Sequence, residues 1–262
     1  MANDIQKTQS DLQTKLDDTL LPQEVIEEIS IKEQTKTLRG VILETFGLGA
    51  VEKVFDTAER IADATDEYKK GLLMQSYIGQ VENAQAEILK LQTFIMNPEG
   101  NILFSKVTRL LSENPLNPYY SQLLAHYLKK TVQSDFQKLF TENIYALNQI
   151  EKLTPQGLIL LADYESWPEY KIMNYSSQRG VVTSEWIEEF LMYYTQVKGI
   201  TEDGMARRIA NTLRELLRNG FIRSKLKNET DSKTLSSIKA STENPAICEP
   251  TELGKEILEY IE

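Results

Sequence analysis

The stretch "ARRIANTLRELLRNGFI", from Ala206 to Ile222, decides the fold. It begins as a helix-forming run without proline or glycine, reaches Gly220, and continues with the apolar residue Phe221. Glycine directly after the last residue of a periodic run is a typical helix end. The stretch therefore predicts a helix that passes directly into a β-strand.

The two faces of this helix differ in chemistry. At about 100° per residue, which follows from 3.6 residues per turn, one side holds Arg207, Asn211, Arg214 and Arg218. The opposite side holds Ile209, Leu213, Leu216 and Leu217. We therefore expect a buried apolar face and an outward polar stripe of three arginines and one asparagine.

The segments around this helix follow a recognisable order. "TSEWIEEFLMYYTQVKG" (183–199) predicts a preceding helix, and "ITEDG" (200–204) predicts a tight turn. "FIRSKLK" (221–227) and "AICEP" (246–250) predict two short strands, and the polar residues 228–245 between them predict a hairpin. A last helix begins at Thr251. Helix, turn, helix, strand, hairpin and strand is the order of a winged helix-turn-helix.

The chain before residue 153 is predicted to be helical throughout. Apolar residues recur at helical spacing from residue 37 to 150, with one long helix expected over 67–96. The fold class is therefore mainly α: an N-terminal helical bundle followed by a winged helix-turn-helix domain with a small β-hairpin wing. We expect an N-terminal helical arm over 1–36, a helical domain over 37–152, and the winged-helix domain over 153–262.

The composition is that of an ordinary globular protein. Hydrophobic residues make up 41% of the 262 residues and charged residues 26%. No apolar run approaches the roughly 20 residues that cross a bilayer, and the N-terminus lacks a basic-then-apolar signal pattern. The lone Cys248 cannot form an internal disulfide. These features favour a cytoplasmic protein without a membrane span.

No enzymatic chemistry is visible in the sequence. The chain has one histidine, His126, and one cysteine, far apart in sequence, which excludes the usual zinc site of nitrogen and sulfur ligands. His126 lies in the amphipathic run "SQLLAHYLKK", where a half-buried or surface histidine is the expected outcome. We predict no catalytic residues, no metal site and no cofactor.

The outward stripe is the candidate binding site. Arginine pairs well with guanine edges and phosphates, and asparagine with adenine. The residues proposed to contact nucleic acid are Arg207, Arg208, Asn211, Arg214, Arg218, Arg223, Lys225 and Lys227. From Thr201 to Ala240 the chain has nine Lys/Arg and five Asp/Glu, although its formal net charge is -10. Positive charge therefore gathers where the predicted recognition helix lies.

Three interpretations of this stripe stay open. It contacts double-stranded DNA, it contacts another protein through the same domain, or it is a solvated helix face without a partner. Winged helices serve both as DNA-binding and as protein-binding modules, so the fold does not decide between them.

Three stretches are similar to the abortive-infection alpha family of bacterial proteins. They are "YYSQLLAHYLKK" (119–130), "ALNQIEKLTPQGLILLADY" (146–164) and "TELGKEILEYI" (251–261). All three are packing patterns without chemical motifs, and the residue before Thr251 is proline where the family pattern has leucine. The resemblance implies a bacterial or phage-borne cytoplasmic protein linked to phage resistance, with no catalytic residues to transfer.

The sequence thus predicts a non-enzymatic winged-helix protein that contacts nucleic acid as a regulator or sensor in a phage-defence setting. The helical domain would hold it as a homodimer or to a protein partner. The alternative is a protein–protein interaction module of a phage-defence system that does not bind DNA.

Overall fold

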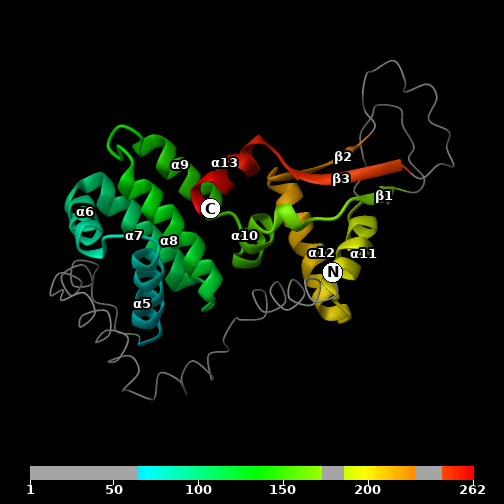
Figure 1. The fold of residues 1–262 in the computed structure, drawn as a ribbon, viewed down its shortest axis with the longest axis horizontal. Helices are drawn as coiled ribbons and strands as arrows, with labels where there is room; N and C mark the ends of the chain where they lie inside the picture. The colour runs from blue at the N-terminus through cyan, green and yellow to red at the C-terminus, as the bar shows by residue number, and fades with distance from the viewer. Residues whose placement is uncertain (1–63, 173–185, 228–243) are drawn as a thin grey trace. The chain divides into compact units, whose positions relative to one another are not determined.

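The computed structural model describes residues 64–172, 186–227 and 244–262 (Figure 1). The expected arm over 1–36, the start of the helical domain over 37–63 and the wing residues 228–243 lie outside this part of the chain. Within it the protein is mainly α-helical, as predicted, and its one small sheet has three strands, the two predicted from the sequence and a third at Tyr170–Ile172. The described residues form two units, a helical unit (64–155 with Glu259–Glu262) and a mixed unit (Gln156–Leu258).

The helical unit packs its helices around a continuous apolar core. Its elements are α5 (Ala64–Gly79), α6 (Ala84–Met96), α7 (Pro98–Glu113), α8 (Pro118–Gln133) and α9 (Phe140–Ile150). Helix α7 packs against the four others, and α8 also packs against α5 and α6. Side chains without solvent exposure include Ile88, Leu91, Phe94, Leu103, Val107, Leu124, Leu128, Leu147 and Ile150.

Three Asn-Pro pairs lie at helix boundaries of this unit, beginning at Asn97, Asn114 and Asn117. The side-chain oxygen of Asn97 accepts a hydrogen bond from the Glu99 backbone N–H at 3.0 Å, and Asn117 accepts one from Tyr120 at 3.0 Å. The prolines that follow these two residues occupy the first helical position, where the missing N–H costs nothing. Asn97 therefore ends α6 and begins α7, whereas α7 ends at Asn114 and α8 begins after Asn117.

The long helix predicted over 67–96 is wrong, because the chain forms two helices there. After α5 the N–H groups of Gln80 and Val81 bond to carbonyls three residues back, which makes a tight turn. Asn83 then caps α6 by accepting a hydrogen bond from Ala86 N–H at 3.0 Å. The apolar spacing continues through this break, and the helical periodicity alone therefore concealed it.

A buried lysine joins α5 to the end of α7. Lys69 Nζ donates hydrogen bonds to the carbonyl oxygens of Ser112 and Asn114, at 3.0 and 2.8 Å. The last carbonyls of a helix lack partners and carry partial negative charge, so a cation there is favourable. Lys69 thus stabilises the C-terminal end of α7 while linking it to a neighbouring helix.

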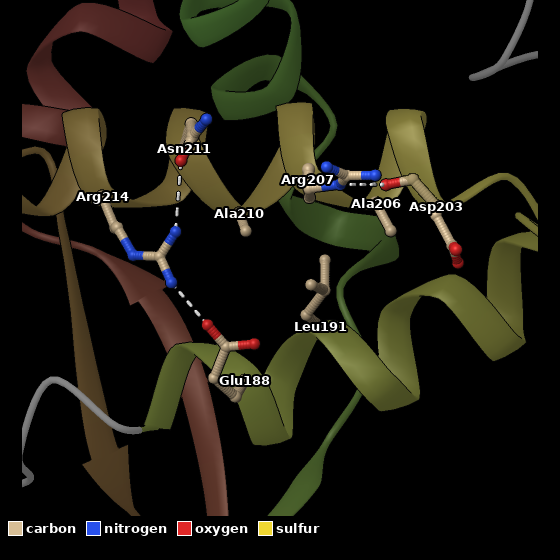
Figure 2. Close-up of a pocket in the computed structure, with 8 residues that line it drawn as sticks. All are labelled: Glu188, Leu191, Asp203, Ala206, Arg207, Ala210, Asn211 and Arg214. Atoms are coloured by element: carbon tan, nitrogen blue, oxygen red, sulfur yellow. Dashed lines mark hydrogen bonds and ion pairs between the residues drawn. The ribbon is translucent and has the colours of Figure 1, made fainter.

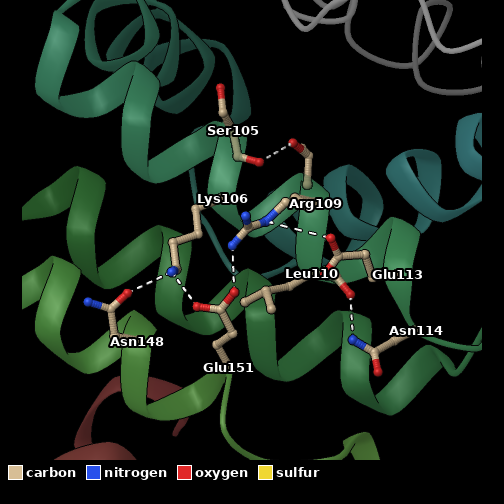
Figure 3. A network of polar contacts seen from close by, with 9 residues as sticks. Ser105, Lys106, Arg109, Leu110, Glu113, Asn114, Asn148 and Glu151 are labelled. Carbon is tan, nitrogen blue, oxygen red and sulfur yellow. Dashed lines mark hydrogen bonds and ion pairs between the residues drawn. The ribbon is translucent and has the colours of Figure 1, made fainter.

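An ionic network connects α7 to α9 on the surface of the helical unit (Figure 3). Lys106 donates a hydrogen bond to Asn148 at 2.6 Å and forms an ion pair with Glu151. Arg109 pairs with Glu151 at 2.5 Å and with Glu113 at 3.8 Å. The hydrogen bond from Lys106, reinforced by the charges of both cations, lowers the pKa of Glu151.

The residues Glu259–Glu262 belong to the helical unit and contact α8 and α9. Lys130 and His126, one turn apart on α8, donate hydrogen bonds to the backbone carbonyls of Glu259 and Glu262, at 2.5 and 2.9 Å. Tyr260 donates from its hydroxyl to Asn143 Oδ1 at 3.2 Å. The half-buried His126 ring thus donates a hydrogen bond to a backbone carbonyl.

The mixed unit places helices beside a small antiparallel sheet. It contains α10 (Pro155–Ala162), a short 3₁₀ helix (Tyr164–Ser166), β1 (Tyr170–Ile172), α11 (Trp186–Lys198), α12 (Asp203–Arg218), β2 (Ile222–Leu226), β3 (Asn244–Pro250) and most of α13 (Glu252–Ile261). The strand order is β1-β3-β2. Strand β3 pairs antiparallel with both neighbours, with Ser224 opposite Cys248 and Tyr170 opposite Ala246.

Two glycines close the helices on either side of the turn before α12. Gly199 and Gly220 have positive φ angles of 65° and 78°. The N–H of the residue after each glycine bonds to a carbonyl five residues back, Ile200 to Thr195 and Phe221 to Leu216. These are Schellman closures, in which glycine adopts the left-handed conformation without a steric cost. Both helix ends lie where the sequence predicts them.

A buried aromatic cluster fixes α11. Rings of Trp167, Tyr170, Trp186 and Phe190 contact one another edge to face or tilted, and Tyr194 stacks on Phe190. The Tyr194 hydroxyl donates to Asp163 Oδ2 at 2.9 Å. Burial, and next the negative charge of Asp163, raise the pKa of Tyr194.

Asp163 also forms a buried ion pair at the other end of α11. Its carboxylate lies 3.1 Å from Lys198 Nζ, and the Lys198 side chain is only 1% exposed. Removing one partner of such a pair leaves an uncompensated buried charge, which is far costlier than losing a surface ion pair. The segment before β1 and the last turn of α11 are therefore held together by charge.

The start of α13 packs closely on the backbone just before β2, and this packing explains the "TELG" pattern (251–254). Thr251 Oγ1 donates to the Gly220 carbonyl at 2.6 Å and accepts from Gly254 N–H at 3.2 Å. A Cβ atom at Gly254 would lie 2.2 Å from the carbonyl oxygen of Phe221. Glycine is needed here because no side chain fits between the helix and the strand.

We predict that Gly254→Ala strongly destabilises the mixed unit, because the new methyl group collides with backbone that cannot move cheaply. The matched control is Gly204→Ala in α12, where a Cβ meets nothing within 4 Å. That change should stabilise by about 0.5–1 kcal/mol, the helix penalty of glycine. Thermal unfolding of both variants measures the contrast. Equal effects would contradict the close approach.

The Glu151 network predicts a pH-dependent contribution to stability. A carboxyl whose folded pKa lies below its ordinary value of 4.5 stabilises the folded state above that pH. This contribution is lost as the pH falls through the folded pKa. Glu151→Gln should lower the free energy of unfolding at pH 7 by at most about 1 kcal/mol.

Urea denaturation of the wild type and Glu151→Gln at several pH values tests this. Their difference should shrink as the pH falls below 4.5. Glu113→Gln is the control, because Glu113 reaches only Arg109, at 3.8 Å, and is 59% exposed. A difference between wild type and Glu151→Gln that does not change with pH would show that the ion pairs do not contribute.

Candidate binding surface on helix α12

Helix α12 separates its faces as predicted. Ile209, Leu213 and Leu216 are buried at 2% exposure or less, and Leu217 is half-buried. The predicted contact residues Arg207, Arg208, Asn211, Arg214 and Arg218 are all exposed. The α12 face, which we define by these five residues, is therefore an accessible surface of the mixed unit.

Helix α11 supplies a carboxylate to the α12 face. Arg214 forms an ion pair with Glu188 at the start of α11 and donates a second hydrogen bond to Asn211 Oδ1 at 3.2 Å. Figure 2 shows the Arg214 guanidinium between these two side chains. Arg207 turns toward its own helix start and donates from Nε to the Asp203 carbonyl at 3.4 Å. Arg214 is thus paired with a carboxylate, whereas the hydrogen bond of Arg207 goes to a backbone carbonyl.

The basic residues of β2 are exposed too, and two of them pair with carboxylates. Arg223 lies 2.7 Å from Glu249 on β3, and Lys227 pairs with Glu169 just before β1. Lys225, between them, is also exposed. The predicted strand contacts therefore form a surface of alternating sign.

A groove of about 580 Å³ lies between α11 and α12. Its lining residues are Glu188, Leu191, Asp203, Ala206, Arg207, Ala210, Asn211 and Arg214. In Figure 2 the small side chains of Ala206 and Ala210 face Leu191 across it, and Arg214 and Glu188 meet at one end. The volume lies within the range of ligand-binding clefts, roughly 300–1,000 Å³.

Sequence reasoning missed the groove and the pairing acids. The spacing of Ala206 and Ala210, four residues apart, is a signal of a narrow helix surface, and Glu188 is visible near the start of its helix. Neither signal reveals that the two meet, because α11 and α12 approach each other only in the folded unit.

The helical unit exposes apolar side chains on two neighbouring helices. Leu89 and Met96 on α6 are 58% and 83% exposed, and Ile102 on α7 is 51% exposed. Leu89 and Met96 are seven residues apart, which places them on one side of α6. This α6–α7 surface, defined by these three residues, is a candidate contact area.

The described residues offer little for covalent or metal chemistry. Burial raises the pKa of the Cys248 thiol well above its ordinary value, which disfavours the reactive thiolate. In the part of the chain that the structure describes, no group of three or more His, Cys, Asp and Glu side chains is arranged to hold a metal ion. None of the described helices is long and apolar enough to span a bilayer.

A family model of the MA3 domain matches residues 69–165, from within α5 to the 3₁₀ helix after α10. The MA3 domain is a helical HEAT-like domain found in translation-initiation factor proteins, and MA3 domains mediate protein interactions. No curated protein and no solved structure matches the chain. The similarity to the MA3 domain agrees with the helical architecture, and no comparison supports the resemblance to the abortive-infection alpha family.

Proposed function

We propose that this chain is a non-enzymatic interaction protein in which each of the two units binds another macromolecule. The helical unit binds a protein partner. The observation that carries this proposal is the match of residues 69–165 to a domain that mediates protein interactions. Leu89, Met96 and Ile102 are more than half exposed on α6 and α7, and a protein contact there would remove their apolar surface from water.

The mixed unit is, in this proposal, a winged helix-turn-helix. The order α10, β1, α11, α12, β2 and β3 supports it, as does the pairing of β1 with β3 and of β3 with β2. Helix α12 would then be the recognition helix. The α12 face is the surface that a winged helix presents to its target.

The charge pattern favours a protein as the target of α12. Glu188, Glu249 and Glu169 each pair with one of the basic residues proposed to contact nucleic acid. A DNA backbone carries a continuous row of phosphates, which these carboxylates would repel. A protein surface presents both signs of charge and can complement an interleaved pattern.

Double-stranded DNA is the second candidate for the α12 face. Arg207, Arg208 and Arg218 are exposed on the proposed recognition helix, and the exposed Lys225 follows on the strand. Arginines on such a helix suit guanine edges and phosphates. The phage-defence setting, the homodimer and the cytoplasmic location stay predictions from the sequence, and the present proposal does not depend on them.

The protein-binding role of the helical unit is tested by co-purification with the tagged full-length chain from its native host. Met96→Glu should abolish the co-purified partner, because it places a charge in an apolar contact. Tyr145→Glu is the matched control, since Tyr145 is also an exposed apolar side chain of the helical unit, at 45%, but lies on α9 and not on α6 or α7. Loss of the partner in both variants, or in neither, would contradict the assignment.

The DNA-binding alternative is tested with random duplex DNA at low and moderate salt. The triple change Arg207→Ala, Arg214→Ala and Arg218→Ala should leave the thermal transition almost unmoved, because all three side chains are exposed. If α12 meets phosphates, wild-type affinity falls steeply with salt and each lost contact reduces the log–log slope by about 0.9. If the wild-type protein does not bind duplex DNA at low salt, the DNA-binding alternative is wrong.

A further inference from the structure

We infer that the groove between α11 and α12 docks one helix of a partner protein, in which two carboxylates seven residues apart flank an apolar side chain. The inference deepens the proposed function, because it rests on a protein being the target of the α12 face. The side chains that line the groove indicate the chemistry of that protein target.

The floor of the groove is apolar and therefore favours contact with an apolar side chain of the partner. Leu191 and Ala206 are half-buried, and Ala210, which lines the groove beside them, is only 4% exposed. Alanines four residues apart form one small-residue strip along α12, which lets a partner side chain approach the helix backbone closely. Covering this floor with an apolar side chain removes apolar surface from water, which favours binding.

Two arginines flank the floor, and the distance between them determines how far apart the partner's carboxylates must lie. Arg207 and Arg214 both line the groove and are seven residues apart on α12. This separation is two helical turns, about 10 Å along the axis. A partner helix lying along α12 repeats the same spacing, so acids seven residues apart meet both arginines while a residue between them faces the alanines.

The acids that line the groove exclude a continuous anion. Glu188 pairs with Arg214 at one end, and Asp203 lies beside Arg207 at the other. A partner carboxylate replaces Glu188 at a single point, whereas a row of phosphates would pass close to both carboxylates. Because the pair of Glu188 with Arg214 is exposed, breaking it costs little, and exchange with a partner acid is feasible.

The experiment titrates the full-length chain into a labelled helical peptide with two glutamates seven positions apart and leucines at the third and fourth positions between them. Binding is followed by fluorescence anisotropy. The wild type should bind, and Arg207→Ala or Arg214→Ala should each weaken binding by about two- to fivefold. Glu188→Gln should strengthen binding by up to about fivefold, because it frees Arg214 from its internal competitor.

Arg218→Ala is the matched control. Arg218 is exposed on the same helix and carries the same charge, but it does not line the groove. It should change peptide affinity by less than about twofold, whereas a loss as large as that of Arg214→Ala would mean general attraction to anions and overturn the inference. A peptide with the leucines replaced by serine should not bind, and equal binding would overturn it as well.

Two further outcomes separate this inference from the proposed function. Duplex DNA that binds more tightly than the peptide, with a loss of affinity in Arg218→Ala, would assign the α12 face to nucleic acid. Absence of peptide binding by a wild type whose partner is still lost in Met96→Glu would overturn the groove and leave the protein-binding role of the helical unit standing. Thermal transitions of all variants confirm that each is folded.

Discussion

The mixed unit depends on the backbone of Gly220 and Phe221, where α12, β2 and α13 meet. The Phe221 N–H closes α12 by bonding to Leu216, and its carbonyl accepts the N–H of Thr251 at 2.9 Å. The Gly220 carbonyl accepts the Thr251 hydroxyl, and Gly254 packs directly on the Phe221 carbonyl. One dipeptide thus orients the end of α12, the start of β2 and the start of α13, which sets the direction in which the α12 face points.

Helix α11 of the same unit is held by aromatic packing and by a buried ion pair. The aromatic cluster buries α11 against β1, while Asp163 ties the last turn of α11 through Tyr194 and Lys198. The aromatic rings contribute buried apolar area, and a shift of α11 away from Asp163 would leave the buried charge of Lys198 without its partner. The groove between α11 and α12 is therefore a surface between two firmly held helices.

The signs of the charges near the α12 face determine what this surface attracts. Eight polar or basic residues predicted as contacts are exposed, yet three of the basic ones have carboxylate partners from α11, β3 and the segment before β1. Such exposed pairs contribute little to stability, and their effect is to change what the surface attracts. Together with the MA3 similarity in residues 69–165, this pattern favours protein partners for both units.

The sequence by itself determined the mainly helical class, the ends of α11 and α12 at Gly199 and Gly220, and the exposed and buried faces of α12. These features are local, because helix periodicity and glycine closure act within a few residues. It did not determine the break after Gly79, since the apolar spacing continues across it. Only the tertiary structure decided that Glu188 meets Arg214 and that Ala206 and Ala210 face Leu191. Those residues come from different helices, and their contacts exist only because packing brings the two helices together.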